Sequence, residues 1–476
     1  MEFKQEQKKK TRVVCTIGPA SENEEMMRKL IMAGMNVMRL NFSHGDFEEH
    51  GGRIVTLHKL QKEMNKNVAI LLDTKGPEIR TGAFVGGATE FKKGQVSVIT
   101  TEDIEGTSER FTITYKELYK DVKPGGFILV NDGQVELLVD HVEGTDIVCV
   151  CANDGVVKNR RGINVPGIKL GFEYLSDKDR GDITFGCEQG VNFIAASFTR
   201  RAQDVLDVKK LLIENGRPEI QIIAKIENSE GVENMDEILA VADGIMVARG
   251  DLGVEIPAED VPGIQKELIQ KCRAAGKVVI TATQMLDSMQ ENPRPTRAEV
   301  SDVANAIYDG TDAIMLSGES AQGKYPEESV KTMTKIAVKT EEKLNYHTLQ
   351  RFAEKTAQLN TSEAICMSVS DIASRFDIKA IVVYTESGST ARRVSRYRPQ
   401  ARILACTPHE EITRTLALNW GVKGMVCPAM NDRSAQVEYA KVISKEDGFE
   451  PGDKIIVVAG AVGVKGTTSF LEVVEL

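Results

Sequence analysis

Short apolar runs, many ending in polar or charged residues, alternate with amphipathic stretches in two separated parts of the chain. This alternation is typical of parallel strands joined by helices. Two intervening stretches, 24–34 and 202–216, have helical spacing of apolar residues and stop at a glycine, so we predict helices there. The eight predicted strands cover residues 11–19, 36–43, 67–74, 192–199, 221–227, 244–251, 277–284 and 312–319.

Between the third and fourth runs the pattern changes to strict alternation of apolar and polar residues with turn glycines, which indicates antiparallel strands. We therefore predict an inserted small β-barrel lid domain at residues 75–168. The flanking segments 1–74 and 169–340 together hold about 246 residues, close to the ~250 that a (β/α)8 barrel needs.

A third region follows a charged helical stretch near residue 340 and again alternates strands with helices. Its predicted strands lie at 380–387, 402–408, 424–428, 453–460 and 467–476. We predict a C-terminal α/β domain at 341–476 that serves effector binding or oligomerisation. The expected fold class is therefore α/β: a (β/α)8 TIM barrel, an inserted lid and a C-terminal α/β domain.

Composition narrows the class of protein. The chain has 476 residues, 41% hydrophobic and 27% charged, which is typical of a folded globular protein. Its net charge of −10 disfavours a nucleic-acid partner, since such proteins present a basic face. The eight cysteines contain no C-x-x-C pair, no apolar run is long enough for a membrane, and the first ten residues lack the apolar core of a secretory signal. We expect a cytoplasmic protein with no membrane partner.

Polar side chains gather at the C-terminal ends of the predicted strands. Because these ends face one mouth in a (β/α)8 barrel, we expect side chains that are distant in sequence to converge there. The residues concerned are Arg39, Asn41, Ser43, Asp73, Thr74, Lys225, Glu227, Arg249, Asp251, Thr283, Ser317 and Glu319.

Glu227 and Asp251 end consecutive predicted strands. Two carboxylates at one mouth can hold magnesium or manganese and leave coordination positions for water and substrate. Taken singly, each carboxylate is more typical of a helix cap or a salt bridge. Their common position at the mouth favours the metal site.

Two cations complete the predicted centre. Lys225 lies two residues before Glu227, so it either neutralises that carboxylate or stabilises a phosphoryl group in transfer, and the two roles are compatible. Arg39 offers a donor fork suited to phosphate or carboxylate. Asn41, Ser43, Asp73 and Thr74 supply oxygens for a monovalent cation, although the same residues also form ordinary turns.

Seven segments, in order, resemble the motifs of the pyruvate kinase family over essentially the whole chain. The resemblance implies transfer of a phosphoryl group from phosphoenolpyruvate to ADP in glycolysis, giving pyruvate and ATP, with magnesium and potassium as cofactors. It also implies a homotetramer. The segments are NVMRLNFSHG, LDTKGPEIRTG, IAKIEN, VARGDLGVE, TATQMLDSM, PTRAEVSDVANA and MLSGESAQGKYP.

The resemblance also implies individual roles. Arg39 and Lys225 would hold the phosphoryl group, Lys225 stabilising the transition state, while Gly250, Asp251 and Thr283 would receive the substrate carboxylate. Thr283 and Ser317 would relay the proton to the enolate, although a hydroxyl bonded to its own backbone is an equal alternative. Glu227 and Asp251 would bind magnesium, and the potassium ligands would be Asn41, Ser43, Asp73 and Thr74, with Glu78 marking the potassium-dependent branch. The nucleotide would contact Asn41, Phe42, Ser43, His44, Arg80 and Arg161.

The loop from Thr385 to Thr390 follows a predicted strand and precedes a helix, so it either cradles a phosphate or forms a plain capped turn. The family uses this region to bind an allosteric sugar phosphate, which makes a sugar phosphate or AMP the expected effector. The charge of Glu386 would oppose an anion there. The expected effector residues are Thr385, Ser387, Gly388, Ser389 and Thr390.

Two other classes of function stay open at this point. A lyase or aldolase acting on pyruvate-like acids also uses magnesium held by Glu and Asp near an arginine, but that class leaves the monovalent-cation ligands and the lid without a role. A metabolite sensor with an inactive site is the other alternative, and it would bind ligand without turnover. No expected catalytic position is missing from the sequence, which favours an active enzyme.

Overall fold

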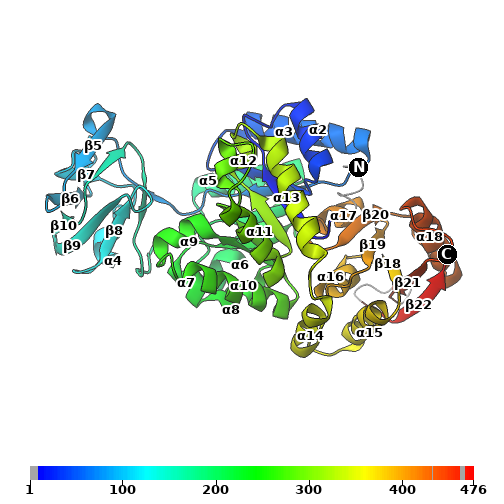
Figure 1. Cartoon of the computed structure of the whole chain (residues 1–476). Coiled ribbons are helices and arrows are strands. Elements are labelled where there is room, and N and C mark those ends of the chain that lie inside the picture. The colour runs from blue at the N-terminus through cyan, green and yellow to red at the C-terminus, as the bar shows by residue number, and fades with distance from the viewer. Residues whose placement is uncertain (1–8, 431, 461–466) are drawn as a thin grey trace.

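The computed structural model describes residues 9–430, 432–460 and 467–476. A parallel barrel lies at the centre of the molecule, with a β domain extending to one side and a C-terminal α/β domain packed on the other (Figure 1). The β domain meets the barrel through two adjacent connecting segments, so it stands away from the barrel body in Figure 1.

The central sheet is a closed barrel of eight parallel strands, which confirms the predicted (β/α)8 architecture. Around the barrel the order is β1-β17-β16-β15-β14-β13-β3-β2. The strands are β1 (Arg12–Thr16), β2 (Val37–Asn41), β3 (Ala69–Asp73), β13 (Phe193–Ala196), β14 (Gln221–Ile226), β15 (Gly244–Ala248), β16 (Val278–Ala282) and β17 (Ala313–Leu316).

The observed strands are shorter than the predicted runs, and two of the differences matter for the site. Run 244–251 was expected to be strand throughout, but β15 ends at Ala248 and helix α9 (Arg249–Glu255) begins at the next residue. Run 312–319 likewise ends at Leu316, followed by α12 (Gly318–Ala321). The physical reason is the pairing register, since the last β15 pair joins Ala248 to the final residue of β16 and no partner strand continues beyond it.

Helices surround the barrel. The two helices predicted from sequence are observed as α2 and α6, each ending one or two residues earlier than expected. At the end of α2, Gly34 adopts a φ of 119°, which favours glycine and terminates the helix. The set comprises α2 (Glu24–Ala33), α3 (Phe47–Met64), α5 (Asp177–Gln189), α6 (Ala202–Glu214), α7 (Ser229–Glu233), α8 (Met235–Val241), α9 (Arg249–Glu255), α10 (Val261–Ala275), η2 (Asp287–Gln290), α11 (Arg297–Asp309), α12 (Gly318–Ala321) and α13 (Pro326–Glu341).

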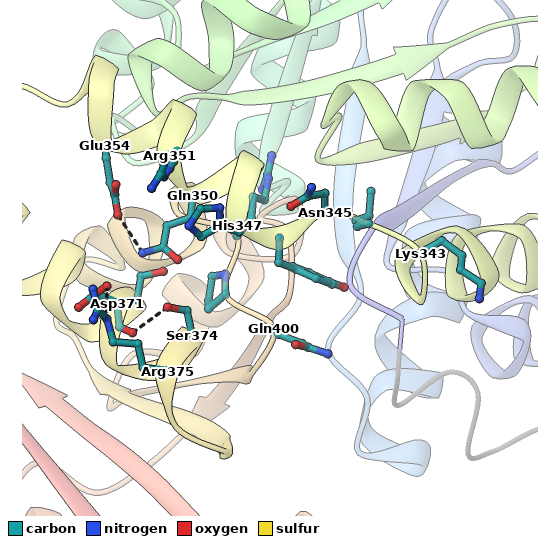
Figure 2. Close-up of a pocket in the computed structure, with 15 residues that line it drawn as sticks. Lys343, Asn345, His347, Gln350, Arg351, Glu354, Asp371, Ser374, Arg375 and Gln400 are labelled. Atoms are coloured by element: carbon teal, nitrogen blue, oxygen red, sulfur yellow. Dashed lines mark hydrogen bonds and ion pairs between the residues drawn. The ribbon is translucent and has the colours of Figure 1, made fainter.

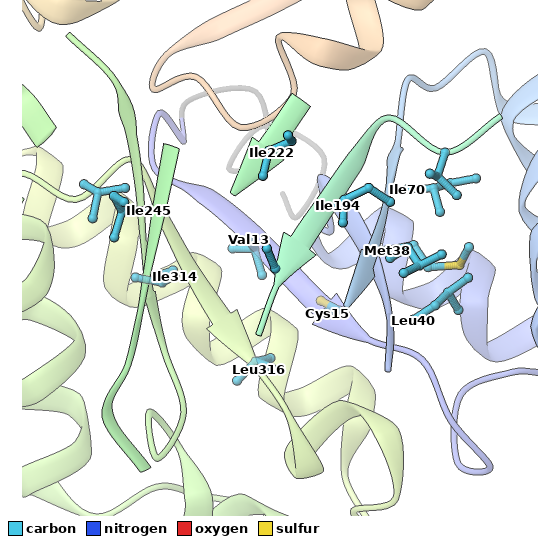
Figure 3. Packing of buried hydrophobic residues seen from close by; sticks show 14 of the residues in the cluster. Val13, Cys15, Met38, Leu40, Ile70, Ile194, Ile222, Ile245, Ile314 and Leu316 are labelled. Atoms are coloured by element: carbon cyan, nitrogen blue, oxygen red, sulfur yellow. The ribbon is translucent and has the colours of Figure 1, made fainter. Parts of the chain in front are cut away.

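Alternate residues of the barrel strands fill two separate cores. Val13 and Cys15 belong to the cluster that packs against the helices, together with Met38 and Ile314 from other strands (Figure 3). Val14 lies between Val13 and Cys15 in sequence and belongs instead to the cluster inside the barrel. The same strands feed both clusters because successive strand side chains point to opposite faces, and the residues of both clusters are buried.

The inserted domain is mostly antiparallel, as its alternating pattern predicted. Its seven-stranded sheet has the order β4-β12-β8-β9-β10-β6-β7, and an isolated bridge from Thr81 to Ile113 joins the segments that follow the two edge strands. One pairing departs from the prediction: β6 and β7 are parallel, since residues 101–109 cross between them. The elements are β4 (Ile79–Arg80), η1 (Val85–Gly87), β5 (Ala88–Phe91), β6 (Val96–Thr100), β7 (Arg110–Thr112), α4 (Leu118–Asp121), β8 (Phe127–Val130), β9 (Val135–Glu143), β10 (Asp146–Cys151), β11 (Gly155–Lys158) and β12 (Gly162–Asn164).

The C-terminal domain is a five-stranded sheet between helices. Four strands are parallel in the order β20-β19-β18-β21, and β22 joins the edge antiparallel to β21. The strands are β18 (Ile378–Tyr384), β19 (Arg402–Thr407), β20 (Val422–Val426), β21 (Lys454–Ala459) and β22 (Phe470–Glu475), and the helices are α14 (Tyr346–Thr356), α15 (Thr361–Arg375), α16 (Ser389–Arg396), α17 (Glu410–Thr415) and α18 (Arg433–Glu446).

All eight cysteines are free and buried, in keeping with the sequence pattern. Among the described helices, none combines the length and the apolar character needed to cross a membrane.

Candidate active site at the barrel mouth

A buried ion network at the C-terminal ends of β2, β3 and β14 forms the centre of the site. Arg39 Nε donates to Asp73 Oδ2 at 2.6 Å, and Lys225 Nζ lies 3.1 Å from Asp73 Oδ1. Burial alone would raise the pKa of Asp73, but Arg39 and Lys225 outweigh it and hold that pKa below its usual value. The sequence predicted that these side chains would converge, and the structure brings them together.

Glu227 immediately follows β14 and completes the network. Its Oε1 lies 3.0 Å from Lys225 Nζ, and its Oε2 accepts a hydrogen bond from the Phe198 backbone N–H at 2.6 Å. Burial of this side chain raises the pKa of the Glu227 carboxyl above its usual range. Burial would lower the pKa of Lys225, yet the Asp73 and Glu227 carboxylates outweigh burial and raise it, so Lys225 remains a cation.

Ser197 was missed by the sequence reasoning. It follows β13, and its Oγ lies 2.9 Å from Asp73 Oδ1 and 2.7 Å from the Thr74 carbonyl oxygen. Lys225 Nζ donates to the same hydroxyl at 2.8 Å. The available signal was its place at a strand end, because run 192–199 was predicted as a barrel strand although no residue in it was singled out.

Asp251 lies in the first turn of α9 and not at a strand end as predicted. The adjacent Gly250 N–H donates to Thr283 Oγ1 at 2.7 Å, and this hydroxyl donates in turn to the Ala282 carbonyl at 2.7 Å. Thr283 adopts a φ of 66°, a conformation unusual for a residue with a branched side chain. The three expected carboxylate-binding residues Gly250, Asp251 and Thr283 therefore adjoin one another.

Ser317 and Glu319 follow β17, where the chain turns into α12. Ser317 is half-buried, and its backbone N–H donates to Glu319 Oε2 at 2.8 Å. Glu319 Oε1 accepts from the Leu286 N–H at 3.0 Å. Glu319 thus organises the loops after β16 and β17, while the Ser317 hydroxyl has no hydrogen-bond partner among the described residues.

The ends of β2 and β3 carry the expected monovalent-cation residues, and the segment after β2 also carries expected nucleotide residues. Asn41 Oδ1 accepts from the Ser43 N–H at 3.2 Å, and Thr74 Oγ1 lies 3.3 Å from the Ala195 carbonyl. His44 is exposed. The Phe42 side chain is buried in the barrel core, so only its backbone is available to a nucleotide.

A pocket of about 290 Å³ lies between the barrel mouth and the inserted domain. Arg80 and Arg161 line it from the inserted domain, and His44 and Asp251 line it from the barrel. Asn164 of β12 reaches across and donates from Nδ2 to Glu255 Oε1 of α9 at 2.9 Å. The expected nucleotide residues therefore share one pocket with an expected metal ligand.

The mouth fits a divalent cation held by two carboxylates. The described residues contain no group of three or more His, Cys, Asp or Glu side chains placed to hold a metal ion. Within the described chain the Asp251 carboxylate has neither an ion-pair nor a hydrogen-bond partner. It nevertheless lies close enough to Glu227 for its charge to raise the pKa of that carboxyl further. Two neighbouring carboxylates, one of them unpartnered, are suited to magnesium or manganese with water completing the coordination.

The segment from Thr385 to Thr390 follows β18 (Ile378–Tyr384) as predicted, but its last two residues already form the first turn of α16 (Ser389–Arg396). Gly388 precedes the helix with a φ of 79° and provides no side-chain cap. Arg392 NH1 donates to the Ser387 carbonyl at 2.8 Å, and Glu386 Oε2 lies 2.9 Å from His409 Nε2. Glu386 therefore contacts His409, the residue that precedes α17. Its carboxylate lies beside the loop that is expected to accept an anion.

The comparisons with known proteins agree over nearly the whole chain. The family described as pyruvate kinase, barrel domain, matches residues 8–330, and the pyruvate kinase alpha/beta domain matches 363–474. The chain is similar to the pyruvate kinase of Staphylococcus saprophyticus, with 53% identity over 98% of this chain and 80% of that protein. It is 50% identical to the pyruvate kinase of Clostridium acetobutylicum, covering 98% and 99% of the two chains. A crystal structure of a pyruvate kinase from Cryptosporidium parvum superimposes with a TM-score of 0.95 at 40% identity, covering 99% of this chain and 97% of that one. With the mouth geometry and both domain families in agreement, the chain belongs to the pyruvate kinase family.

Proposed function

We propose that the barrel mouth transfers the phosphoryl group of phosphoenolpyruvate to ADP, giving pyruvate and ATP in glycolysis. The observation that carries this proposal is the convergence of Arg39 and Lys225 on Asp73, at 2.6 and 3.1 Å, beside the carboxylate of Glu227. Two cations held in a buried network suit a transferring phosphoryl group, because its charge develops where water is excluded.

Glu227 and Asp251 are the proposed ligands of Mg2+ or Mn2+. Family membership fits a metal-dependent enzyme. The bound metal would neutralise phosphoryl oxygens and orient the substrate. Lys225 remains charged beside Glu227, so the chain itself supplies a second positive charge to the group in transfer.

In the proposed reaction, the P–O bond of phosphoenolpyruvate breaks as a terminal oxygen of ADP bonds to phosphorus. The enolate left behind then takes a proton on its methylene carbon. Thr283 and Ser317 are the candidate relay through water. Ser317 suits this role because its hydroxyl has no partner among the described residues, whereas the Thr283 hydroxyl must first leave the Ala282 carbonyl.

The substrate carboxylate is proposed to bind at Gly250, Asp251 and Thr283. Asp251 would contribute through the metal ion that it would hold together with Glu227. Asn41, Ser43, Asp73 and Thr74 are the proposed K+ ligands. The nucleotide is proposed to contact the segment from Asn41 to His44 together with Arg80 and Arg161. The 290 Å³ pocket supports this placement because its lining includes both arginines and His44.

The domain limits predicted from the sequence, 1–74 with 169–340, 75–168 and 341–476, are also part of the proposal. The inserted domain would close over nucleotide and metal and exclude water. The C-terminal domain would bind a sugar phosphate or AMP at Thr385, Ser387, Gly388, Ser389 and Thr390. We further propose a cytoplasmic homotetramer that binds neither nucleic acid nor membrane.

Pyruvate formation from phosphoenolpyruvate and ADP tests the function. With Mg2+ present, we expect turnover that rises by an order of magnitude or more when K+ replaces tetramethylammonium. The variant Glu78→Lys should lose much of that K+ dependence, because its ammonium group would supply the positive charge that K+ otherwise provides. Aldol cleavage of a 2-keto acid without pyruvate formation from phosphoenolpyruvate would contradict the proposal, as would ligand binding without turnover.

A further inference from the structure

A large pocket lies where the C-terminal domain meets the last barrel helix, well away from the mouth. Its volume is about 750 Å³, larger than that of the mouth pocket. One wall comes from α14, where Gln350, His347 and Glu354 are seen, and another from α15, with Asp371, Ser374 and Arg375 (Figure 2). A pocket of this size is in the range that small organic ligands occupy.

The lining carries more positive than negative charge. Its cations are Lys343, Arg351, Arg375 and Arg398, and its carboxylates are Glu354 and Asp371. Both carboxylates are already engaged: Asp371 Oδ1 accepts from Arg375 Nε at 2.9 Å, and Glu354 Oε1 accepts from Gln350 Nε2 at 2.8 Å. Within the described chain, Arg351 and Lys343 have no ion-pair or side-chain hydrogen-bond partner, so they are free to pair with an anion.

Two buried polar atoms of the lining also lack partners. Ser370 is 1% exposed, yet its Oγ makes no hydrogen bond to any described residue. Arg398 is 3% exposed, and its Nε is unpartnered in the same sense. A buried polar atom without a partner costs free energy, and a ligand that bonds to it recovers that cost.

Arg398 also connects the pocket to the barrel. Its NH1 donates to Asp312 Oδ1 at 2.7 Å and its NH2 to the Gly310 carbonyl at 2.9 Å. Asp312 immediately precedes β17, the strand whose other end leads to Ser317. A ligand that bonds to Arg398 would therefore contact the residue that joins the C-terminal domain to a barrel strand.

We propose that this pocket binds a phosphate monoester of a hydroxylated metabolite, at a site separate from both the mouth and the loop from Thr385 to Thr390. The phosphate pairs with Arg351 and neighbouring cations of the rim. The hydroxyl groups of the ligand bond to Ser370 and to the amide and carboxylate groups of α14 and α15. A sugar phosphate and a nucleoside monophosphate share this chemistry.

Calorimetric titration of the full chain with glucose 6-phosphate and, separately, with AMP tests the site. Three incomplete probes serve as controls. Glucose and adenosine lack the phosphate group, and inorganic phosphate lacks the hydroxylated organic part. We expect one phosphate monoester to bind with a dissociation constant below about 1 mM, and each incomplete probe to bind at least about tenfold more weakly. The probe that binds identifies the sugar phosphate or the nucleotide as the source.

Variants locate the binding. Arg351→Glu should weaken binding by about tenfold or more, whereas Lys355→Glu, which reverses the same charge on α14 outside the pocket, should leave it unchanged. Ser370→Ala should weaken binding without lowering Tm, because the hydroxyl it removes has no partner in the free protein. Ser389→Asp repels anions from the effector loop proposed above, so the binding that this variant retains should be the binding at the present pocket, and adding Arg351→Glu should weaken it.

Three results would overturn the proposal. The first is the absence of binding by both phosphate monoesters at about 10 mM. The second is binding that persists in Arg351→Glu and Ser370→Ala but disappears in Ser389→Asp. The third is equal binding of glucose or adenosine and its phosphate ester.

Discussion

At the scale of single residues, Ser197 shows how a neutral side chain can organise a charged centre. Its hydroxyl contacts Asp73 Oδ1 and receives a hydrogen bond from Lys225, so it fixes the distance between an anion and a cation. Burial makes such a contact more consequential than at the surface, because no water replaces it. We infer that Ser197 positions Lys225 and does not itself react.

Ser197→Ala should therefore lower kcat by roughly three- to tenfold and lower stability by about 1 kcal/mol, since one buried hydrogen-bonded group is lost. The measurements are steady-state kinetics and thermal unfolding. Ser320→Ala offers a matched control, because Ser320 is a buried mouth serine whose Oγ donates to the Thr16 carbonyl at 2.8 Å and touches no charged side chain. We expect Ser320→Ala to lose stability and keep its kcat. If Ser197→Ala also keeps its kcat unchanged, the positioning role is refuted.

The charged residues of the site were predictable, and the neutral one was not. Arg39, Lys225 and Glu227 are unusual at the end of an apolar run, so each attracts attention in the sequence. A serine at such a position is common and carries no charge. The part that Ser197 plays depends on the side chains of two other strands, which only the fold brings within reach.

At the scale of elements, the segment after β2 is fixed by helix α3. His50 is buried and stacks on Phe42 with ring centroids 4.1 Å apart, and its Nε2 lies 2.9 Å from the His44 carbonyl. This contact joins the helix to the loop that carries Asn41 and Ser43. Burial lowers the pKa of His50, with the nearby Arg53 adding to the effect and the His44 carbonyl opposing it.

A lowered folded-state pKa makes stability depend on pH. Below about pH 6.5 the unfolded chain binds a proton at this histidine that the folded chain resists, so the free energy of unfolding falls on acidification. His50→Gln should be less stable near neutral pH but lose less stability between about pH 7 and pH 5. Urea unfolding at the two pH values measures this, with the exposed His141→Gln as control. An acid-induced loss identical to that of the unsubstituted chain would contradict the prediction.

The strand and helix pattern was largely readable from the sequence, and its limits have physical causes. Periodicity identifies an apolar run but cannot locate the last residue that has a partner on the neighbouring strand, which is why β15 ends at Ala248 and Asp251 lies in α9. The parallel pairing of β6 with β7 could not be predicted either. Alternating residues predict a strand, but the relative direction of two strands depends on the path of the segment that connects them.

At the scale of the whole molecule, a side-chain hydrogen bond helps to join the inserted domain to the barrel near the mouth. Asn164 of β12 donates to Glu255 of α9, four residues after Asp251 in the same helix. Burial raises the pKa of Glu255, and the hydrogen bond from Asn164 partly offsets this effect. The contact holds the inserted domain beside the barrel residues that line the shared pocket, among them His44 and Asp251.

Asn164→Ala should raise KM for ADP by roughly two- to fivefold with a smaller effect on KM for phosphoenolpyruvate, because the domain would be held less firmly over the nucleotide. Asn153→Ala is the comparison. Its amide donates to the Gln134 carbonyl at 2.8 Å and serves only the inserted domain itself, so it should affect stability alone. Equal changes in KM for ADP in both variants would rule out a specific role for the Asn164 contact.

The domain arrangement was visible in the sequence because the insertion changes the hydrophobic period from helical to alternating. The way the domains meet was not visible. The pair formed by Arg398 and Asp312 joins residues 86 positions apart in the sequence, and the 750 Å³ pocket depends on how α14, α15 and the segment after α16 pack together. Contacts of this kind follow from side-chain packing that no local pattern encodes.

The central claim is that Lys225 stabilises a phosphoryl group transferred at the mouth, and kcat of the variant Lys225→Met tests it most directly. Loss of a buried cation between two carboxylates should lower stability, so circular dichroism and Tm must first show that the variant is folded. Lys266→Met, at an exposed lysine on α10, is the control. With saturating phosphoenolpyruvate, ADP, Mg2+ and K+, we predict that kcat of Lys225→Met falls by about 10³-fold or more while that of Lys266→Met is unchanged. A folded Lys225→Met variant whose kcat stays within about tenfold of the unsubstituted enzyme would contradict the claim.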